Sequence, residues 1–362
     1  MRARASKEFL ALAAGKALDE QCQQQWRVAR PPVGNAVADD FAWFEGPIPE
    51  PGDGEVLLKT LYLSLAPVMR DYMTGQPMAG EAPLAIGDVI HGRGVAQVVK
   101  SRHVDWPEGA VVQGQIGWQT YKCSRMSADE KMRRMPANGL PASLGLGALG
   151  MTGLSAWAGL FNCAKPRPGD VFVLSGAAGG VGSLVSQMAA NIVGCEVVGI
   201  AGGAEKCAFI QTIGCRAAID YKAGGVADQL RPVVPDGLDV YFDNVGGDIL
   251  DACMDHLRHG ARIVLCGSIS EYTAATPYRL PGYTRLRRTD ASMRGFFVYN
   301  HLGDWHRAMT EMADWIKAGK LRPVENLTHG FEHMPAALAG MYDGSNTGKQ
   351  LCVVRGEVDD WI

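Results

Sequence analysis

Residues 171–183 of this 362-residue chain read Val-Phe-Val-Leu-Ser-Gly-Ala-Ala-Gly-Gly-Val-Gly-Ser. The apolar run 171–175 is typical of a short buried strand, and a helical pattern over 183–193 follows the glycines. Gly179 would let the backbone approach a pyrophosphate, and Gly182 would let the helix pack closely on the strand. The helix N-terminus adds free N–H groups for an anion. This strand–turn–helix unit predicts a dinucleotide site.

Strands and helices alternate beyond this turn. The sequence predicts strands over 196–200, 217–219, 239–243 and 262–266, and helices over 204–213 and 248–258. Short strands that alternate with helices of about ten residues indicate βαβ units and a parallel sheet. With right-handed crossovers, the chain would form a doubly wound α/β domain.

Both ends of the chain have a different pattern. Residues 55–63, 89–99 and 110–112 predict short strands separated by Gly and Pro turns. Residues 325–331 and 350–355 predict further strands, with a helix near 335–342 between them. Short strands at this spacing favour a small barrel or sandwich. We therefore expect one β-rich domain formed by 25–150 and 321–362, interrupted by a dinucleotide-binding domain over 151–320.

The first 24 residues precede this pattern. Basic residues flank an apolar run that Gly15 closes after only a few residues, too short for a secretory signal. Glu8 fits an organellar transit peptide poorly. We expect a loosely ordered N-terminal extension.

Composition narrows the function classes. The formal net charge is −3, which gives no basic footprint for nucleic acid or an anionic membrane. No apolar run reaches the length of a membrane-spanning helix. The nine cysteines contain no C-x-x-C pair, so neither a disulfide framework nor a ribbon-type zinc site is indicated. These features favour a cytoplasmic protein without nucleic-acid or membrane partners.

The choice between NAD and NADP depends on the end of the second predicted strand. Residues 201–203 offer no carboxylate for a free ribose 2′-hydroxyl, whereas Lys206 follows in the first turn of the next helix. A bound 2′-phosphate would explain a cation there, because it otherwise opposes the helix dipole. Tyr221 could place its hydroxyl on the same phosphate. The alternatives are a solvated Lys206 paired with Glu205, and a half-buried core tyrosine at 221; we predict NADPH.

A catalytic zinc site is not indicated. Such a site needs three protein ligands, and the stretch 65–71 contains no thiolate. His91 is followed by glycine where zinc alcohol dehydrogenases keep a His-Glu pair. We expect His91 to be a structural or channel-lining residue, and we predict no metal.

Several motifs together resemble one family. They are Glu55-Val-Leu-Leu-Lys-Thr-Leu-Tyr-Leu-Ser-Leu-Ala-Pro-Val-Met-Arg, Leu149-Gly-Met-Thr-Gly-Leu-Ser-Ala, the glycine turn, Tyr241-Phe-Asp-Asn-Val-Gly-Gly, Cys266-Gly-Ser-Ile-Ser-Glu-Tyr, Gly295-Phe-Phe-Val and Gly344-Ser-Asn-Thr-Gly-Lys. In this order they resemble the zinc-independent medium-chain dehydrogenase/reductases, in the leukotriene B4 dehydrogenase, prostaglandin reductase and 2-alkenal reductase branch. The resemblance implies a Rossmann doubly wound parallel sheet inserted in a GroES-like β-barrel domain. Thr152, Gly176 and Ala66 depart from the family pattern; these departures leave the cofactor assignment alone but put details of the first-domain pocket in doubt.

The resemblance also implies a set of NADP(H)-binding residues. They are Met151, Gly179, Gly180, Val181, Gly182, Ser183, Lys206, Tyr221, Asn244, Cys266, Gly267, Ser268, Ile269, Ser270, Phe296, Val298 and Asn346. Lys206 and Tyr221 would hold the 2′-phosphate, and 180–183 would line the pyrophosphate. Asn244 and 266–272 would face the ribose and nicotinamide. Phe296 and Val298 would hold the carboxamide through their backbone, and Asn346 would reach in from the C-terminal tail.

The implied reaction is reduction of the C=C bond of an α,β-unsaturated aldehyde or ketone. Hydride would pass from NADPH to the β-carbon while negative charge develops on the carbonyl oxygen. Tyr272 matches the family's tyrosine, and a neutral phenol is a suitable hydrogen-bond donor to that oxygen. Alternatively, Tyr272 is an aromatic wall of the pocket. Two other functions remain open, a quinone reductase and a non-catalytic NADPH-binding module; related enzymes are often dimers, so we expect a homodimer acting on a small apolar substrate.

A long irregular stretch follows Tyr272. Residues 273–293 contain two prolines and predict a lid or substrate loop. Tyr278 and Tyr283 could line an apolar pocket, and the arginines at 285, 287 and 288 could meet an acidic substrate tail. The alternative for these arginines is a solvated charge cluster or a subunit contact.

Overall fold

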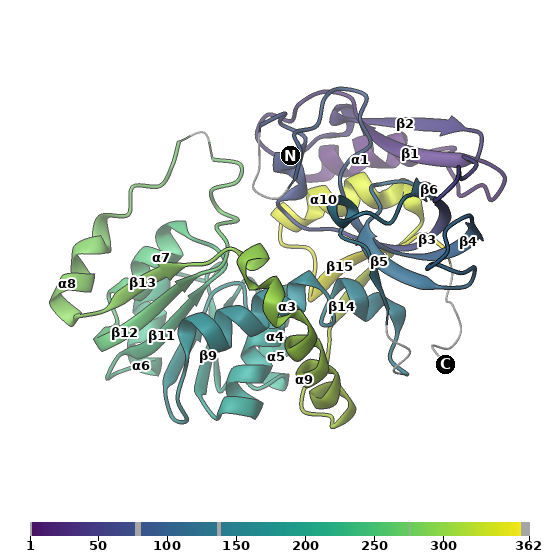
Figure 1. Cartoon of the computed structure of the whole chain (residues 1–362). Coiled ribbons are helices and arrows are strands. Elements are labelled where there is room, and N and C mark those ends of the chain that lie inside the picture. The colour runs from purple at the N-terminus through teal and green to yellow at the C-terminus, as the bar shows by residue number, and fades with distance from the viewer. Residues whose placement is uncertain (1, 77–80, 136–138, 275, 356–362) are drawn as a thin grey trace. The chain divides into compact units, whose positions relative to one another are not determined.

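The chain forms two compact units in a computed structural model that describes residues 2–76, 81–135, 139–274 and 276–355 (Figure 1). The first unit comprises residues 1–146, 326–346 and 350–362. The second comprises residues 147–325, together with 347–349 from the returning tail. The second unit is therefore inserted in the first along the chain.

The second unit contains a six-stranded parallel sheet. Its strands are β8 (Val171–Leu174), β9 (Glu196–Ala201), β10 (Ala217–Asp220), β11 (Leu238–Asp243), β12 (Leu257–Leu265) and β13 (Ser292–Gly295). They lie in the order β10-β9-β8-β11-β12-β13, and every neighbouring pair of strands is parallel. The order reverses between β8 and β11, which is the switch point of a doubly wound sheet. The predicted α/β fold class is confirmed.

Helices connect these strands (Figure 1). They are α3 (Met151–Ala158), η4 (Gly159–Ala164), α4 (Gly180–Gln187), η5 (Met188–Val193), α5 (Ala204–Thr212), α6 (Val226–Val233), α7 (Gly247–Met254), η6 (Pro281–Thr284), α8 (Arg285–Thr289), η7 (Val298–Asp304) and α9 (Trp305–Lys317). The central strands β8 and β11 are buried along almost their whole length, because helices cover both faces of such a sheet. Their side chains pack in one apolar core with α6 and α7.

The first unit is mainly antiparallel. Its strands are β1 (Gln23–Val28), β2 (Phe41–Gly46), β3 (Val56–Ser64), β4 (Arg93–Ser101), β5 (Val111–Gln115), β6 (Tyr121–Ser124), β7 (Arg133–Arg134), β14 (Glu325–His329) and β15 (Lys349–Val353). Seven strands form one sheet in the order β14-β15-β3-β4-β5-β7, with β6 also on β3, and β1 pairs with β2. The short helical elements are η1 (Ala38–Asp40), α2 (Met69–Tyr72), η2 (Ala128–Glu130), η3 (Ala142–Leu146), η8 (Phe331–His333) and α10 (Met334–Tyr342). Trp26, Trp118 and Phe331 are fully buried in its core.

The N-terminal extension is ordered, so the expectation of a loose segment is wrong. Residues Arg2–Ala13 form helix α1, which buries Phe9 edge-on against Phe41. The apolar residues of this segment cover one end of an apolar core.

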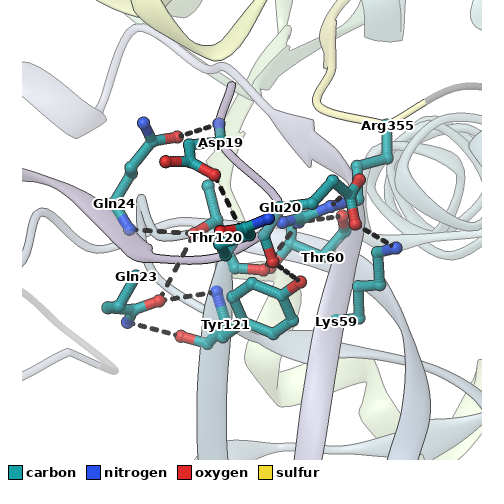
Figure 2. A network of polar contacts seen from close by, with 10 residues as sticks. Asp19, Glu20, Gln23, Gln24, Lys59, Thr60, Thr120, Tyr121 and Arg355 are labelled. Atoms are coloured by element: carbon teal, nitrogen blue, oxygen red, sulfur yellow. Dashed lines mark hydrogen bonds and ion pairs between the residues drawn. The ribbon is translucent and has the colours of Figure 1, made fainter. Parts of the chain in front are cut away.

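A polar network then ties the segment after α1 to the first unit (Figure 2). Glu20 forms ion pairs with Lys59 at 2.6 Å and with Arg355 at 3.0 Å. Burial alone would raise the pKa of Glu20, but these two cations outweigh it and lower the pKa. Arg355 also donates to the carbonyl oxygens of Thr60 and Thr120. The network joins the first and the last described segments of the first unit.

Three predictions about the secondary structure of the second unit are also wrong. The helix predicted over 248–258 ends at Met254, because β12 begins at Leu257 rather than at 262. The helix predicted over 183–193 begins at Gly180, directly on the glycine turn. The stretch 273–293 is not irregular throughout, since η6 and α8 lie within it.

Candidate functional site

The site residues predicted in the second unit gather at one edge of its sheet. The glycine turn follows β8, Lys206 and Tyr221 follow β9 and β10, Asn244 follows β11, residues 266–272 follow β12, and Phe296 and Val298 follow β13. All of these positions lie beyond the carboxyl ends of parallel strands. Ligands of doubly wound folds bind in the crevice outside these ends, at the switch point. The fold therefore brings the predicted residues to the expected place.

The glycine turn is closed by short backbone contacts. The Gly179 N–H donates to the Gly176 carbonyl oxygen at 2.9 Å, and Gly176 has a φ of +60°. A β-carbon on Gly182 would lie 2.1 Å from that same oxygen, a distance no side chain can adopt. Gly182 is therefore required for α4 to begin so close to the turn. Helix α4 starts at Gly180, and its first turn contains Val181 and the buried Ser183.

The returning tail passes beside this turn. Gly348 donates its N–H to the Ala178 carbonyl oxygen at 2.7 Å, and it forms a parallel bridge with Gly179. A β-carbon on Gly180 would lie 3.3 Å from Lys349 Cδ and 3.3 Å from Thr152 Cγ2. Burial lowers the pKa of Lys349 to about 7, although the charge of Glu325 opposes this shift. Three segments thus form a close cradle at the start of α4.

A second cluster lies beyond β9 and β10. The ring of Tyr221 covers Gly202, since a β-carbon there would lie 2.7 Å from the Tyr221 hydroxyl oxygen. Lys206 is half-buried in the first turn of α5. Burial lowers the pKa of Lys206, and the neighbouring charge of Lys222 lowers it further. An anion bound beside Lys206 would offset the repulsion between these two positive charges.

The loops of this cluster are fixed by one carboxylate. Asp220 Oδ1 accepts hydrogen bonds from the N–H groups of Gly203 at 2.8 Å and Lys222 at 2.9 Å. These two bonds are the main cause of the lowered pKa of Asp220. Its carboxylate is thereby engaged by protein backbone.

The segment after β12 carries the candidate catalytic tyrosine. Tyr272 is half-buried, and its hydroxyl oxygen lies 3.6 Å from the position that a β-carbon on Gly267 would take. Burial, then the charge of Asp243, raises the pKa of Cys266 to about 12, so this thiol stays protonated at neutral pH. Gly267, Ser268 and Ile269 are half-buried, whereas Ser270 is exposed.

The remaining predicted residues lie beyond β13, on α3 and in the returning tail. Phe296 packs against Gly159, where an added β-carbon would lie 3.0 Å from the ring, and Val298 begins η7. Met151 is the first residue of α3 in the second unit. Asn346 lies in the returning tail, two residues before Gly348.

The pocket role suggested for Tyr278 and Tyr283 stays a prediction. Tyr278 and Tyr283 are exposed by 40% and 63%. Arg285 forms ion pairs with Asp251 and Asp255 on and beside α7, so it is held within the protein rather than directed to an acidic ligand.

Within the ranges that the structure describes, no group of three His, Cys, Asp or Glu side chains is placed to hold a metal ion. His91 Nε2 lies 2.8 Å from the Ala82 carbonyl oxygen, and its ring meets Tyr72 edge-on. In the same ranges, no helix has the length and apolar character needed to cross a bilayer.

Sequence reasoning missed the polar groups that support this edge. Asp243, Ser175 and Tyr241 are almost fully buried and hydrogen-bonded to one another at the switch point. The available signal was a polar residue at the end of each of two apolar strands that are neighbours in the sheet.

Comparison with known proteins places these features in context. The family described as the N-terminal domain of oxidoreductase matches residues 24–132, and the family described as zinc-binding dehydrogenase matches residues 180–317. The chain is 37% identical to the NADPH-dependent curcumin reductase of Escherichia coli (strain K12) over 345 residues, which is 93% of this chain and 99% of the relative. It is 35% identical to prostaglandin reductase 1 of Bos taurus over 331 residues, 91% and 98% of the two chains. A solved structure, CurA from Vibrio vulnificus in complex with NADPH, superimposes with a TM-score of 0.85 at 37% identity and covers 92% of this chain and 99% of its own.

Proposed function

Because the chain belongs to the prostaglandin reductase and 2-alkenal reductase branch of the medium-chain dehydrogenase/reductases, we propose that it is an NADPH-dependent reductase of conjugated C=C bonds. Its substrates are small, apolar α,β-unsaturated aldehydes and ketones. The observation that carries this proposal is the gathering of the candidate cofactor residues at the switch point, with a half-buried lysine and a tyrosine beyond β9 and β10.

The residues at this edge fit NADP(H). Gly179 and Gly182 let the turn close tightly on the Gly176 carbonyl oxygen, so that the start of α4 would present its N–H groups to a pyrophosphate. Lys206 and Tyr221 would hold the 2′-phosphate, with Lys222 close enough to lower the pKa of Lys206. The adenosine half of the cofactor thus has a cationic site, and no acidic residue stands at 201–203 to prefer a free 2′-hydroxyl.

The nicotinamide half of the cofactor would be bound by residues that follow β11, β12 and β13. Asn244 and 266–270 would face the ribose and nicotinamide, and the backbone of Phe296 and Val298 would hold the carboxamide. Asn346 and Met151 complete the proposed set. When bound, NADPH supplies the hydride that is transferred to the β-carbon.

Tyr272 acts on the substrate. A phenol O–H is a hydrogen-bond donor, and it donates to the carbonyl oxygen on which negative charge develops. The nearby Cys266 thiol is protonated, which keeps a competing negative charge out of this part of the site. The half-buried position of Tyr272 in the segment after β12 supports this role.

The function is tested by NADPH oxidation against enals, enones, quinones and simple alcohols, with NADH as the cofactor control. We expect turnover of enals and enones, with NADPH strongly preferred. Quinone turnover without enone turnover would replace the proposal by a quinone reductase. NADPH binding without turnover of any substrate would leave a non-catalytic NADPH-binding protein.

The proposal extends to assembly and location. A homodimer and a cytoplasmic location are usual for enzymes of this kind and agree with the position of β13 at the end of the strand order and with the low net charge. Light scattering on the purified chain measures the first. A fluorescent fusion in the native cell tests the second.

A further inference from the structure

One buried carboxylate lies at the centre of the switch point. Asp243, the last residue of β11, is 1% exposed. Its Oδ1 accepts hydrogen bonds from the hydroxyl groups of Ser175 and Tyr241, each at 2.8 Å. The N–H of Gly246 donates to both carboxylate oxygens, and the N–H of Val245 donates to Oδ1 at 3.1 Å. The carboxylate therefore has partners directly after β8, on β11 and in the loop after β11.

This carboxylate determines how Asn244 is held. Ser175 Oγ, which donates to Asp243, accepts the backbone N–H of Asn244 at 2.9 Å. The side-chain Nδ2 of Asn244 donates to the Ser175 carbonyl oxygen at 2.8 Å. Both bonds join Asn244 to the end of β8, so its side chain has one orientation as long as Ser175 stays in place.

The same loop supports the segment after β12. The N–H groups of Cys266 and Gly267 donate to the carbonyl oxygen of Asp243, at 2.8 and 3.2 Å. Ser270 donates to the carbonyl oxygen of Val245 through both its N–H and its hydroxyl. A shift of the loop 243–246 would therefore move Asn244 and the 266–270 segment together.

We propose that Asp243 is a positioning residue for the nicotinamide half of the cofactor site, acting through Ser175 and the loop 243–246. The inference rests on the proposed function, because it takes Asn244 and 266–270 as the residues that face that half. Lys206 and Tyr221 follow β9 and β10, on the other side of β8 in the strand order. Loss of the carboxylate should therefore affect one half of the cofactor and not the other.

The decisive variant is Asp243→Asn, which keeps the shape but turns one acceptor into an NH₂ group facing N–H and O–H donors. Calorimetry should show a loss of about tenfold in affinity for NADP⁺ and less than twofold for adenosine 2′,5′-bisphosphate, which carries only the phosphorylated adenosine. Ser175→Ala, which removes one hydroxyl and leaves the carboxylate, should give a smaller loss with the same selectivity. Asp40→Asn is the matched control: Asp40 is also 1% exposed and bonded to Arg30 and the Val37 N–H, but in the first unit.

Hydrogen exchange of the ligand-free protein gives a second readout. In Asp243→Asn, the amides of residues 244–246 and 266–270 should exchange at least tenfold faster, while those of the glycine turn and of α5 keep their rates. Equal losses of affinity for both ligands, or faster exchange throughout the second unit, would show a merely structural role and overturn the inference. A wild-type protein that binds neither ligand would refute the proposed function instead, and the exchange pattern would still decide whether the network holds these segments.

Discussion

The aromatic ring of Tyr221 lies against Gly202, so close that a β-carbon at 202 would come within 2.7 Å of the Tyr221 hydroxyl oxygen. Gly202 follows β9 and Tyr221 follows β10, two strands that are neighbours in the sheet. A glycine at the end of β9 thus does more than leave out an acidic side chain. It makes room for the tyrosine on the surface where the 2′-phosphate is proposed to bind.

Gly202→Ala should therefore displace Tyr221 and raise the dissociation constant of NADPH by roughly fivefold to tenfold, which corresponds to loss of about one good hydrogen bond. NADH binding should change little, because it lacks the phosphate. Fluorescence titration with both cofactors measures the effect. Gly224→Ala is the nearby control, since its β-carbon would meet only Gln229 at 3.7 Å. Equal losses for NADPH and NADH would contradict the role of Tyr221.

Tyr272→Phe should lower the turnover number for enone reduction at least several-fold. Loss of a dominant oxyanion donor costs about 10²–10³-fold, and we expect a smaller effect where hydride positioning contributes most of the rate. The NADPH dissociation constant should barely change, because the hydroxyl acts on the substrate. Steady-state kinetics with Tyr283→Phe as an exposed control checks both statements. Unchanged turnover would leave Tyr272 as a wall of the pocket.

Local sequence patterns predicted the second unit well. The apolar stretch at β8 and the glycines after it are signals contained within a few residues, and both lie where predicted. By contrast, β13 reads Ser-Met-Arg-Gly, and as an edge strand it has little buried surface to impose an apolar pattern. Helix α1 was missed for a related reason, because only its packing against Phe41 distinguishes it from a loose segment.

The candidate site was predictable only in part. Positions such as Lys206 and Asn244 follow from the rule that ligands bind beyond the carboxyl ends of parallel strands. The bond between Asp243 and Ser175 joins residues 68 apart in sequence, and no local pattern encodes it. The contact of Tyr221 with Gly202 likewise depends on which strands are neighbours. Residues proposed to bind the cofactor were thus easier to predict than residues that hold them in place.

Lys349 predicts a specific pH dependence of stability. Burial lowers its pKa to about 7 in the folded protein, against about 10.4 for a lysine in an unfolded chain. Between these values the unfolded state binds more protons, so this group makes the free energy of unfolding rise as the pH increases from about 7 to about 10.4. Below that window Lys349 is protonated in both the folded and the unfolded state. The folded state then bears the full free-energy cost of burying its charge.

Urea unfolding at several pH values measures this effect in wild type and in Lys349→Met/Glu325→Gln, which removes the cation and its acidic neighbour together. The free energy of unfolding of the wild type, minus that of the double variant, should increase as the pH rises through this window. Lys317→Met, at an exposed position of α9, should show no such trend. A difference that stays constant with pH would show that Lys349 titrates normally.

The N-terminal helix offers two adjacent positions with opposite burial. Phe9 is 6% exposed and packs on Phe41, whereas Leu10 is 63% exposed. Phe9→Ala should lower the free energy of unfolding by roughly 3 kcal/mol, as for other buried aromatic side chains. Leu10→Ala should change it by less than about 0.5 kcal/mol. Equal effects in chemical denaturation would mean that α1 does not pack on the first unit in solution.

The central claim is that hydride reaches the β-carbon of a conjugated C=C bond while Tyr272 donates to the carbonyl oxygen. The most direct test uses NADPH carrying deuterium at both C4 positions, a simple enone and proton NMR of the product. We predict a saturated ketone with deuterium on the β-carbon and a solvent proton on the α-carbon. Deuterium on the carbonyl carbon of an allylic alcohol, or a product without deuterium, would contradict the proposed reaction.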